Sequence, residues 1–145
     1  MGFVAIKTVE QQDLQATHRV RSLLVRQRTA KANEIRGLLS EYGVVISKRI
    51  DILRRALAPL VEDGERDLSD AFKILLRGLH EDLIRLDERV DVLDRAIERV
   101  ARDHPTAKRL QQIPGIGPVT ATALVASVGD GRQFRRAAIW LPGWG

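Results

Sequence analysis

The longest regular pattern in the chain lies at residues 69–103, which read SDAFKILLRGLHEDLIRLDERVDVLDRAIERVARD. Apolar side chains recur there at alternating intervals of four and three residues. This heptad pattern places them on one stripe of an α-helix, as in a coiled coil. Ser69 or Asp70 can cap the start, and Pro105 follows the end. The stripe consists of Phe72, Leu76, Leu79, Leu83, Leu86, Val90, Leu93, Ile97 and Val100.

The segment before this helix predicts two more helices. Thr8 and Gln11 fit a capping box, so one helix should run from about Glu10 to Tyr42 and stop at Gly43. A shorter helix should cover about residues 47–61, followed by a polar loop at residues 62–67. The partner of the heptad stripe is then either the first helix, folded back, or a second copy of the chain. The apolar stripe of the shorter helix consists of Ile50, Leu53, Leu57 and Leu60.

Charge is unevenly distributed along the 145 residues, whose net charge is +5. Residues 1–60 carry 11 Lys and Arg against 5 Asp and Glu, residues 61–104 carry 8 against 13, and residues 105–145 carry 5 against 1. This pattern fits either helices that neutralise each other or contact with a nucleic acid. Within the heptad helix, Glu81 with Arg85 and Asp91 with Arg95 have the spacing of favourable ion pairs.

The composition also excludes several classes of protein. Without cysteine, the chain has neither disulfides nor thiolate chemistry. No apolar run approaches the roughly 20 residues of a membrane span, and no secretory signal is visible. We therefore expect a cytoplasmic protein that has no membrane partner.

A second motif lies at residues 106–129, TAKRLQQIPGIGPVTATALVASVG. A short helix, a turn at Ile113–Gly117 and a second helix starting at Pro118 match a helix-hairpin-helix. The two glycines allow positive φ, and Ile116 should anchor the turn in the core. The backbone amides near Gly115 and Gly117, at the positive end of the second helix, would then face one anion, such as a DNA phosphate. The alternative is a turn with a purely structural role.

The predicted nucleic-acid-binding residues fall into two groups. One group surrounds the turn, where Arg132 adds a further basic residue, and the other lies on the first helix, where a solvated basic face is the alternative. We expect no catalytic or metal-ligating residue, because the acids lie between the apolar positions and the serines have no adjacent base. The residues of the first group are Ile113, Pro114, Gly115, Ile116, Gly117, Thr120, Lys108 and Arg109, and those of the second are Arg21, Arg26, Arg28 and Lys31.

Several of these strings resemble one protein family in their order along the chain. FVAIKTVEQQDLQ at residues 3–15 resembles the linker after the nuclease domain in transposases of the insertion sequence 110 group. IPGIGP at residues 113–118, with TATAL at 120–124, resembles the start of that family's C-terminal transposase domain. The resemblance covers about residues 3–135. Shorter matches to the linker are HRVR at 18–21, QRT at 27–29, NEIRGLL at 33–39 and EYG at 41–43.

The resemblance implies a bacterial, nucleoid-associated and RNA-guided DNA recombinase that assembles through a coiled-coil arm. The family has a nuclease domain with four acidic Mg²⁺ ligands and, further along, a nucleophilic serine. These ligands would lie upstream of Met1, and the serine downstream of Phe134, where the sequence reads RRAAIWLPGWG. We therefore expect an all-α fragment that binds DNA, holds no cofactor and does not cut. Residues 1–104 would form a helical linker and coiled-coil arm, and residues 105–145 a truncated transposase domain with the helix-hairpin-helix.

A structured guide RNA and a second copy of the chain are the other expected partners. Two alternatives remain open from the sequence. The chain is either a stand-alone helix-hairpin-helix DNA-binding protein with a coiled-coil dimerisation arm, or a structural coiled-coil adaptor.

Overall fold

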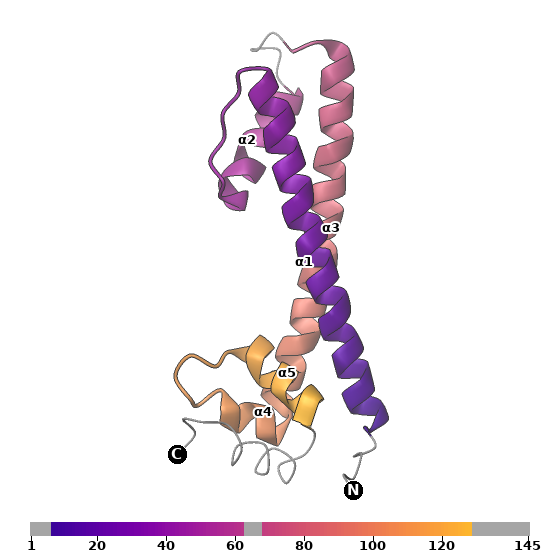
Figure 1. Ribbon diagram of the computed structural model, residues 1–145, viewed down its shortest axis with the longest axis vertical. Coiled ribbons are helices and arrows are strands. Elements are labelled where there is room, and N and C mark those ends of the chain that lie inside the picture. Colours follow the sequence, from indigo (N-terminus) through magenta and orange to yellow (C-terminus); the bar gives the residue numbers. More distant parts are fainter. Residues whose placement is uncertain (1–6, 63–67, 129–145) are drawn as a thin grey trace, which may run out of the picture. The chain divides into compact units, whose positions relative to one another are not determined.

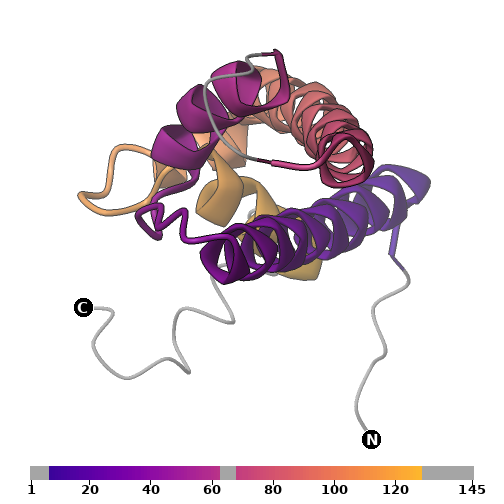
Figure 2. The same ribbon diagram turned by 90° about the horizontal axis from the view of Figure 1, so that it is seen from above.

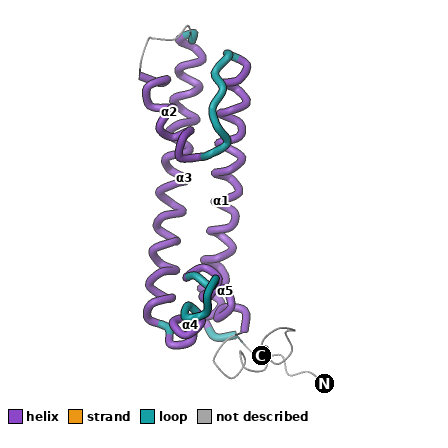
Figure 3. The backbone as a smooth tube through the Cα atoms, turned by 90° about the vertical axis from the view of Figure 1, so that its left-hand side faces the viewer, coloured by secondary structure: helices purple, strands orange, loops and turns teal. Residues whose placement is uncertain are grey.

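The computed structural model describes residues 7–62 and 68–128, and these residues form helices and loops only (Figures 1 and 3). The all-α prediction is therefore confirmed. All helices but one begin and end within two residues of their predicted bounds; the exception, α2, begins three residues later than expected. Most of the predicted loop at 62–67, together with Arg132, lies outside the described residues. The helices are α1 (Val9–Glu41), α2 (Ile50–Glu62), α3 (Asp70–Asp103), α4 (Pro105–Leu110) and α5 (Pro118–Val128).

Local hydrogen bonds fix both ends of α1. The Thr8 hydroxyl accepts a hydrogen bond from the Gln11 amide at 3.1 Å, and the Gln11 side-chain oxygen accepts one from the Thr8 amide at 3.1 Å. At the other end Gly43 has a φ of 78°. The amides of Gly43 and Val44 donate to the carbonyls of Ser40 and Leu39, both at 3.0 Å. These contacts are a capping box and a Schellman motif, so both predicted signals are confirmed.

The start of α3 settles the choice between two capping residues. The Ser69 hydroxyl accepts a hydrogen bond from the Phe72 amide at 3.2 Å. The Ser69 carbonyl also accepts the first intrahelical bond, from Lys73 at 3.0 Å. Ser69 rather than Asp70 is therefore the N-cap.

The chain divides into two compact units, and α1 and α3 contribute residues to both. We call Leu23–Val90 the three-helix unit, and Met1–Ser22 with Asp91–Gly145 the turn unit. The predicted boundary at residue 104 separates the arm from the transposase domain by function, which the two units do not test. It therefore stays a prediction.

In the three-helix unit, α2 lies beside α1 and α3 (Figure 2). Leu53 and Leu57 of its predicted stripe are buried, while Ile50 and Leu60 are half-buried and Val61 completes the buried side. In this unit the heptad stripe therefore packs against helices of the same chain. The buried core consists of Ala32, Ile35, Leu39, Val44, Leu53, Leu57, Val61, Leu68, Phe72, Leu76 and Leu83.

The heptad stripe resolves into two rows that the sequence does not distinguish. One row, spaced by seven residues, is at most 1% exposed. The other row begins at the buried Phe72, and its four later positions are half-buried and still reach solvent. The chain thus covers one edge of the stripe more completely than the other. The buried row is Leu76, Leu83, Val90 and Ile97, and the half-buried row is Leu79, Leu86, Leu93 and Val100.

The turn unit has a separate core made largely of small side chains. Ala121 is fully buried and Ala126 is 2% exposed, which lets α5 approach its neighbours closely. Gln111 joins this core to the end of α3, since its side-chain amide donates to the carbonyls of Ala101 at 2.8 Å and Ala107 at 3.1 Å. The core is built from Leu14, Ala107, Leu110, Ala121, Val125 and Ala126, with Val100, Ile116 and Leu124 packed against it.

Candidate nucleic-acid interface

The glycine turn, residues 111–117, joins α4 to α5. Short-range bonds shape it: the Ile113 amide donates to the Leu110 carbonyl and the Ile116 amide to the Ile113 carbonyl, both at 3.1 Å. Gly115 has a φ of 90°, a conformation that favours glycine. The turn therefore depends on a residue without a side chain at this position.

Gly117 does not behave as the sequence predicted. Among the glycines that the structure describes, only Gly43 and Gly115 have positive φ. Gly117 precedes Pro118, whose ring disfavours compact backbone conformations in the residue before it. Its carbonyl also accepts the first bond of α5, from Ala121 at 2.9 Å, so Gly117 takes the N-cap place. The expectation that both glycines use positive φ was wrong for Gly117.

The glycine turn is open to solvent. Ile116 is half-buried and packs against the turn-unit core, so the predicted anchor is confirmed. A Cβ built on Gly115 or Gly117 would meet no atom within 4 Å. The other predicted residues around the turn are exposed: Ile113, Pro114, Gly115, Gly117, Thr120, Lys108 and Arg109.

Four backbone amides around the turn donate no hydrogen bond to another described residue. Two precede Pro118, and two belong to the first turn of α5, where N–H groups have no intrahelical acceptor. They lie at the positive end of the α5 dipole. Together they offer donors to an external anion. The four amides are those of Gly115, Gly117, Val119 and Thr120.

His18, which the sequence analysis missed, connects α1 to the helix that carries this end. Its Nε2 lies 2.9 Å from the hydroxyl oxygen of Thr122, a fully buried residue of α5. The Thr122 hydroxyl donates to the Pro118 carbonyl at 2.7 Å, so His18 is the donor in the contact between the two side chains. Burial lowers the pKa of His18, and the neighbouring Arg21 guanidinium lowers it further. The folded turn unit thus favours the neutral imidazole.

Three of the four predicted binding residues on α1 contact acids of α3. Arg21 pairs with Asp94 in the turn unit. In the three-helix unit, Arg28 lies 3.4 Å from Asp87 and Lys31 lies 3.7 Å from Asp82. Numbers rise along α1 as they fall along α3 in this unit, so the two helices run antiparallel there. These contacts match the alternative in which the helices neutralise each other.

Arg26 is the exception among the four. It is exposed and forms no ion pair with another described residue. Of the two ion pairs predicted within α3, Glu81–Arg85 is present at 3.9 Å. Asp91 and Arg95, which are also exposed, form no ion pair within the described part of the chain.

The described residues contain no group of three His, Cys, Asp or Glu that could hold a metal ion. Nor is any helix between residues 7 and 128 long and apolar enough to cross a membrane.

A sequence profile described as the transposase IS116/IS110/IS902 family matches residues 107–139, which include the glycine turn and α5. A probable family 20 transposase of Pseudomonas aeruginosa is 43% identical over 97% of this chain. The chain is a homologue of these transposases. The transposase for insertion sequence element IS1111A of Coxiella burnetii is 39% identical over 94% of the chain, and that for IS1328 of Yersinia enterocolitica is 37% identical over 92%.

The chain spans about two fifths of the length of these transposases: 43%, 38% and 39%, respectively. No solved structure matches it. The predicted family is confirmed, and named transposases do not favour a stand-alone DNA-binding protein.

Proposed function

We propose that this transposase segment binds the backbone of DNA at the glycine turn. The observation that carries the proposal is the set of four amides without an acceptor, exposed at the start of α5. Such amides bind phosphate through charge-assisted hydrogen bonds, and they read no base. Lys108 and Arg109, exposed in the last turn of α4, add positive charge a few residues before the glycine turn.

The proposed role is binding of DNA, without cleavage by the described residues. Relatives named as transposases of insertion sequences support DNA as the partner. A structured guide RNA is a further proposed partner, because the same amides would donate hydrogen bonds to its phosphate oxygens.

The test replaces both glycines of the turn. The Gly115→Val/Gly117→Val double variant should bind a fluorescein-labelled DNA duplex at least about tenfold more weakly in fluorescence anisotropy at low salt. Each hydrogen bond to a charged group contributes about 1.5–3 kcal/mol, and the new side chains hinder the approach of the phosphate.

Gly43→Val is the matched control. Gly43 has a similar φ of 78° and open space around it, but it lies in the three-helix unit. This variant bears similar backbone strain, so it should lose stability and keep its affinity for DNA. Unchanged affinity in the double variant would refute the proposed role of the turn.

A further inference from the structure

The ion pairs separate two sets of arginines that look alike in sequence. Arg21 and Arg28 of α1 contact acids of α3, and their side chains are only about a quarter exposed, 25% and 24%. On α3 itself, Arg95 and Arg99 are exposed and pair with no described acid. Arg102 reaches only its neighbour Asp103, at 3.7 Å.

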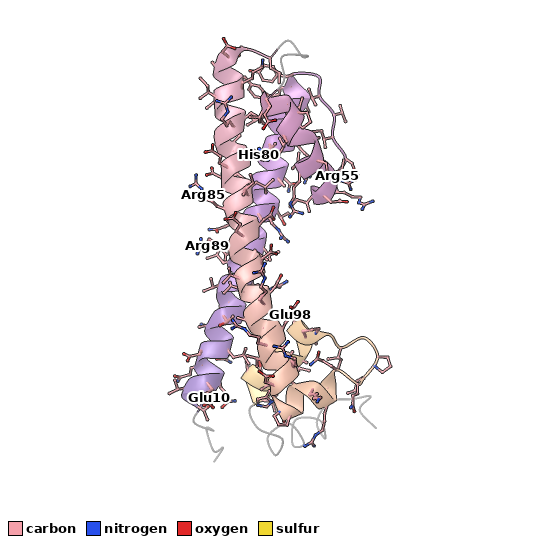
Figure 4. All side chains as sticks on the ribbon, turned by 180° about the vertical axis from the view of Figure 1, so that it is seen from behind. Glu10, Arg55, His80, Arg85, Arg89 and Glu98 are labelled. Atoms are coloured by element: carbon pink, nitrogen blue, oxygen red, sulfur yellow. The ribbon has the colours of Figure 1, made fainter. Side chains whose placement is uncertain are left out.

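Arg95, Arg99 and Arg102 form a row on one side of α3, since residues three and four apart are neighbours on a helix. We call it the arginine row. Ile97 and Ala101 are buried at 0% and 2% exposure, so the row faces away from the core. With Val92 and Glu98 the row lines a shallow depression. Glu98 is the one acid in that lining, and Figure 4 shows it on the part of α3 beside α4 and α5.

We propose that the arginine row is a second contact for the backbone of duplex DNA, which the glycine turn holds at the same time. This inference rests on the proposed function of the turn. Charge complementarity carries it, because guanidinium groups match phosphates in geometry and stay charged at every physiological pH. Both contacts belong to the turn unit.

The length of the row fits this partner. Its seven-residue span corresponds to about 10 Å along the helix. One DNA strand carries a phosphate about every 3.4 Å along the duplex axis, so about three phosphates face three arginines.

The experiment measures how the affinity for a labelled duplex depends on salt. The Arg95→Gln/Arg99→Gln/Arg102→Gln variant should show a slope of log K against log salt that is shallower by about 2.7, the value for three lost phosphate contacts. Arg77→Gln/Arg85→Gln/Arg89→Gln makes the same change on α3 in the three-helix unit, and its slope should equal that of the wild type. Circular dichroism melting confirms that both variants fold.

A gain of binding excludes a folding defect as the explanation. Glu98→Gln removes the one acid that lines the depression with the row, so it should raise the affinity for the duplex a few-fold at low salt. Unchanged affinity in this variant, together with an unchanged slope in the triple variant, overturns the inference. If the triple variant loses binding to an RNA stem-loop but binds the duplex as the wild type does, the inference is also overturned, because the row would then bind RNA.

The two proposals fail in different ways. A triple variant with the wild-type slope, combined with weak binding by the Gly115→Val/Gly117→Val variant, leaves the turn's role standing and rejects the row. A wild-type chain that binds no duplex at low salt rejects both.

Discussion

The basic residues of α1 and those of the outer side of α3 have the same chemistry and different neighbours. On α1, Arg21, Arg28 and Lys31 each meet an aspartate of α3. On α3, Arg95 and Arg99 meet solvent. The comparison teaches that positive charge in a sequence is available to a nucleic acid only where the fold supplies no acid of its own. Substitutions can test this contrast between residues that have partners within the chain and residues that remain exposed.

The largest effect is expected at Asp87, which serves two guanidiniums. Arg54 makes two hydrogen bonds to it, at 2.6 and 2.5 Å, and Arg28 lies at 3.4 Å. Asp87→Ala should lower the free energy of unfolding by about 2 kcal/mol in urea denaturation, because it leaves two partly buried cations without a counterion. Asp91→Ala, at an exposed acid of the same helix, should change it by less than about 0.5 kcal/mol. An equal loss of unfolding free energy in the two variants would contradict the proposed difference between paired and exposed acids.

The next effect concerns the half-buried row of the heptad. We propose that a second copy of the chain covers it, as apolar coiled-coil positions that remain open favour association. Leu86→Gln/Leu93→Gln should then reduce the molar mass in size-exclusion chromatography with light scattering to that of a monomer. Ile84→Gln/Val92→Gln, at exposed apolar positions outside the heptad, serves as the control. A wild-type chain that is monomeric at high concentration would rule this assembly out.

The smallest effect is a pH dependence of stability at His18. Its folded pKa is lowered, first by burial and then by Arg21, so the unfolded chain takes up a proton more readily. The free energy of unfolding should therefore fall as pH drops through about 6.5, the ordinary histidine pKa, and level off below the folded value. His18→Gln keeps a donor for Thr122 but does not titrate, so its unfolding free energy should vary less between about pH 7.5 and 5.5. Identical pH profiles for the two proteins would remove His18 as the cause.

Local signals predicted most of the fold. The Thr8–Gln11 capping box and the stop at Gly43 each involve residues only a few positions apart, so the sequence shows them directly. The turn between α4 and α5 was predicted for the same reason. The conformation of Gly117 was not, because two glycines in one turn invited the same interpretation for both.

Contacts between distant residues were beyond the sequence. His18 and Thr122 are 104 positions apart, and only the packing of α1 against α5 brings them together. Which arginines find an acid depends on the register of α1 against α3, and the heptad repeat alone leaves that register open. Burial of the stripe also involves α2, since Leu53 and Leu57 share a core with Leu76 and Leu83. The sequence therefore showed that α1 carries basic residues, but not that acids of α3 pair with most of them. It also did not single out the arginine row, because acidic and basic residues alternate along α3.

Asp87 also couples substitutions on three helices. One carboxylate on α3 neutralises Arg28 of α1 and Arg54 of α2, and the Nε of Arg28 is buried with no acceptor among the described residues. Loss of one arginine therefore removes a local surplus of positive charge. Loss of both arginines leaves the partly buried aspartate without a counterion. Substitutions at positions 28 and 54 should be non-additive, and related sequences should change them in concert with position 87.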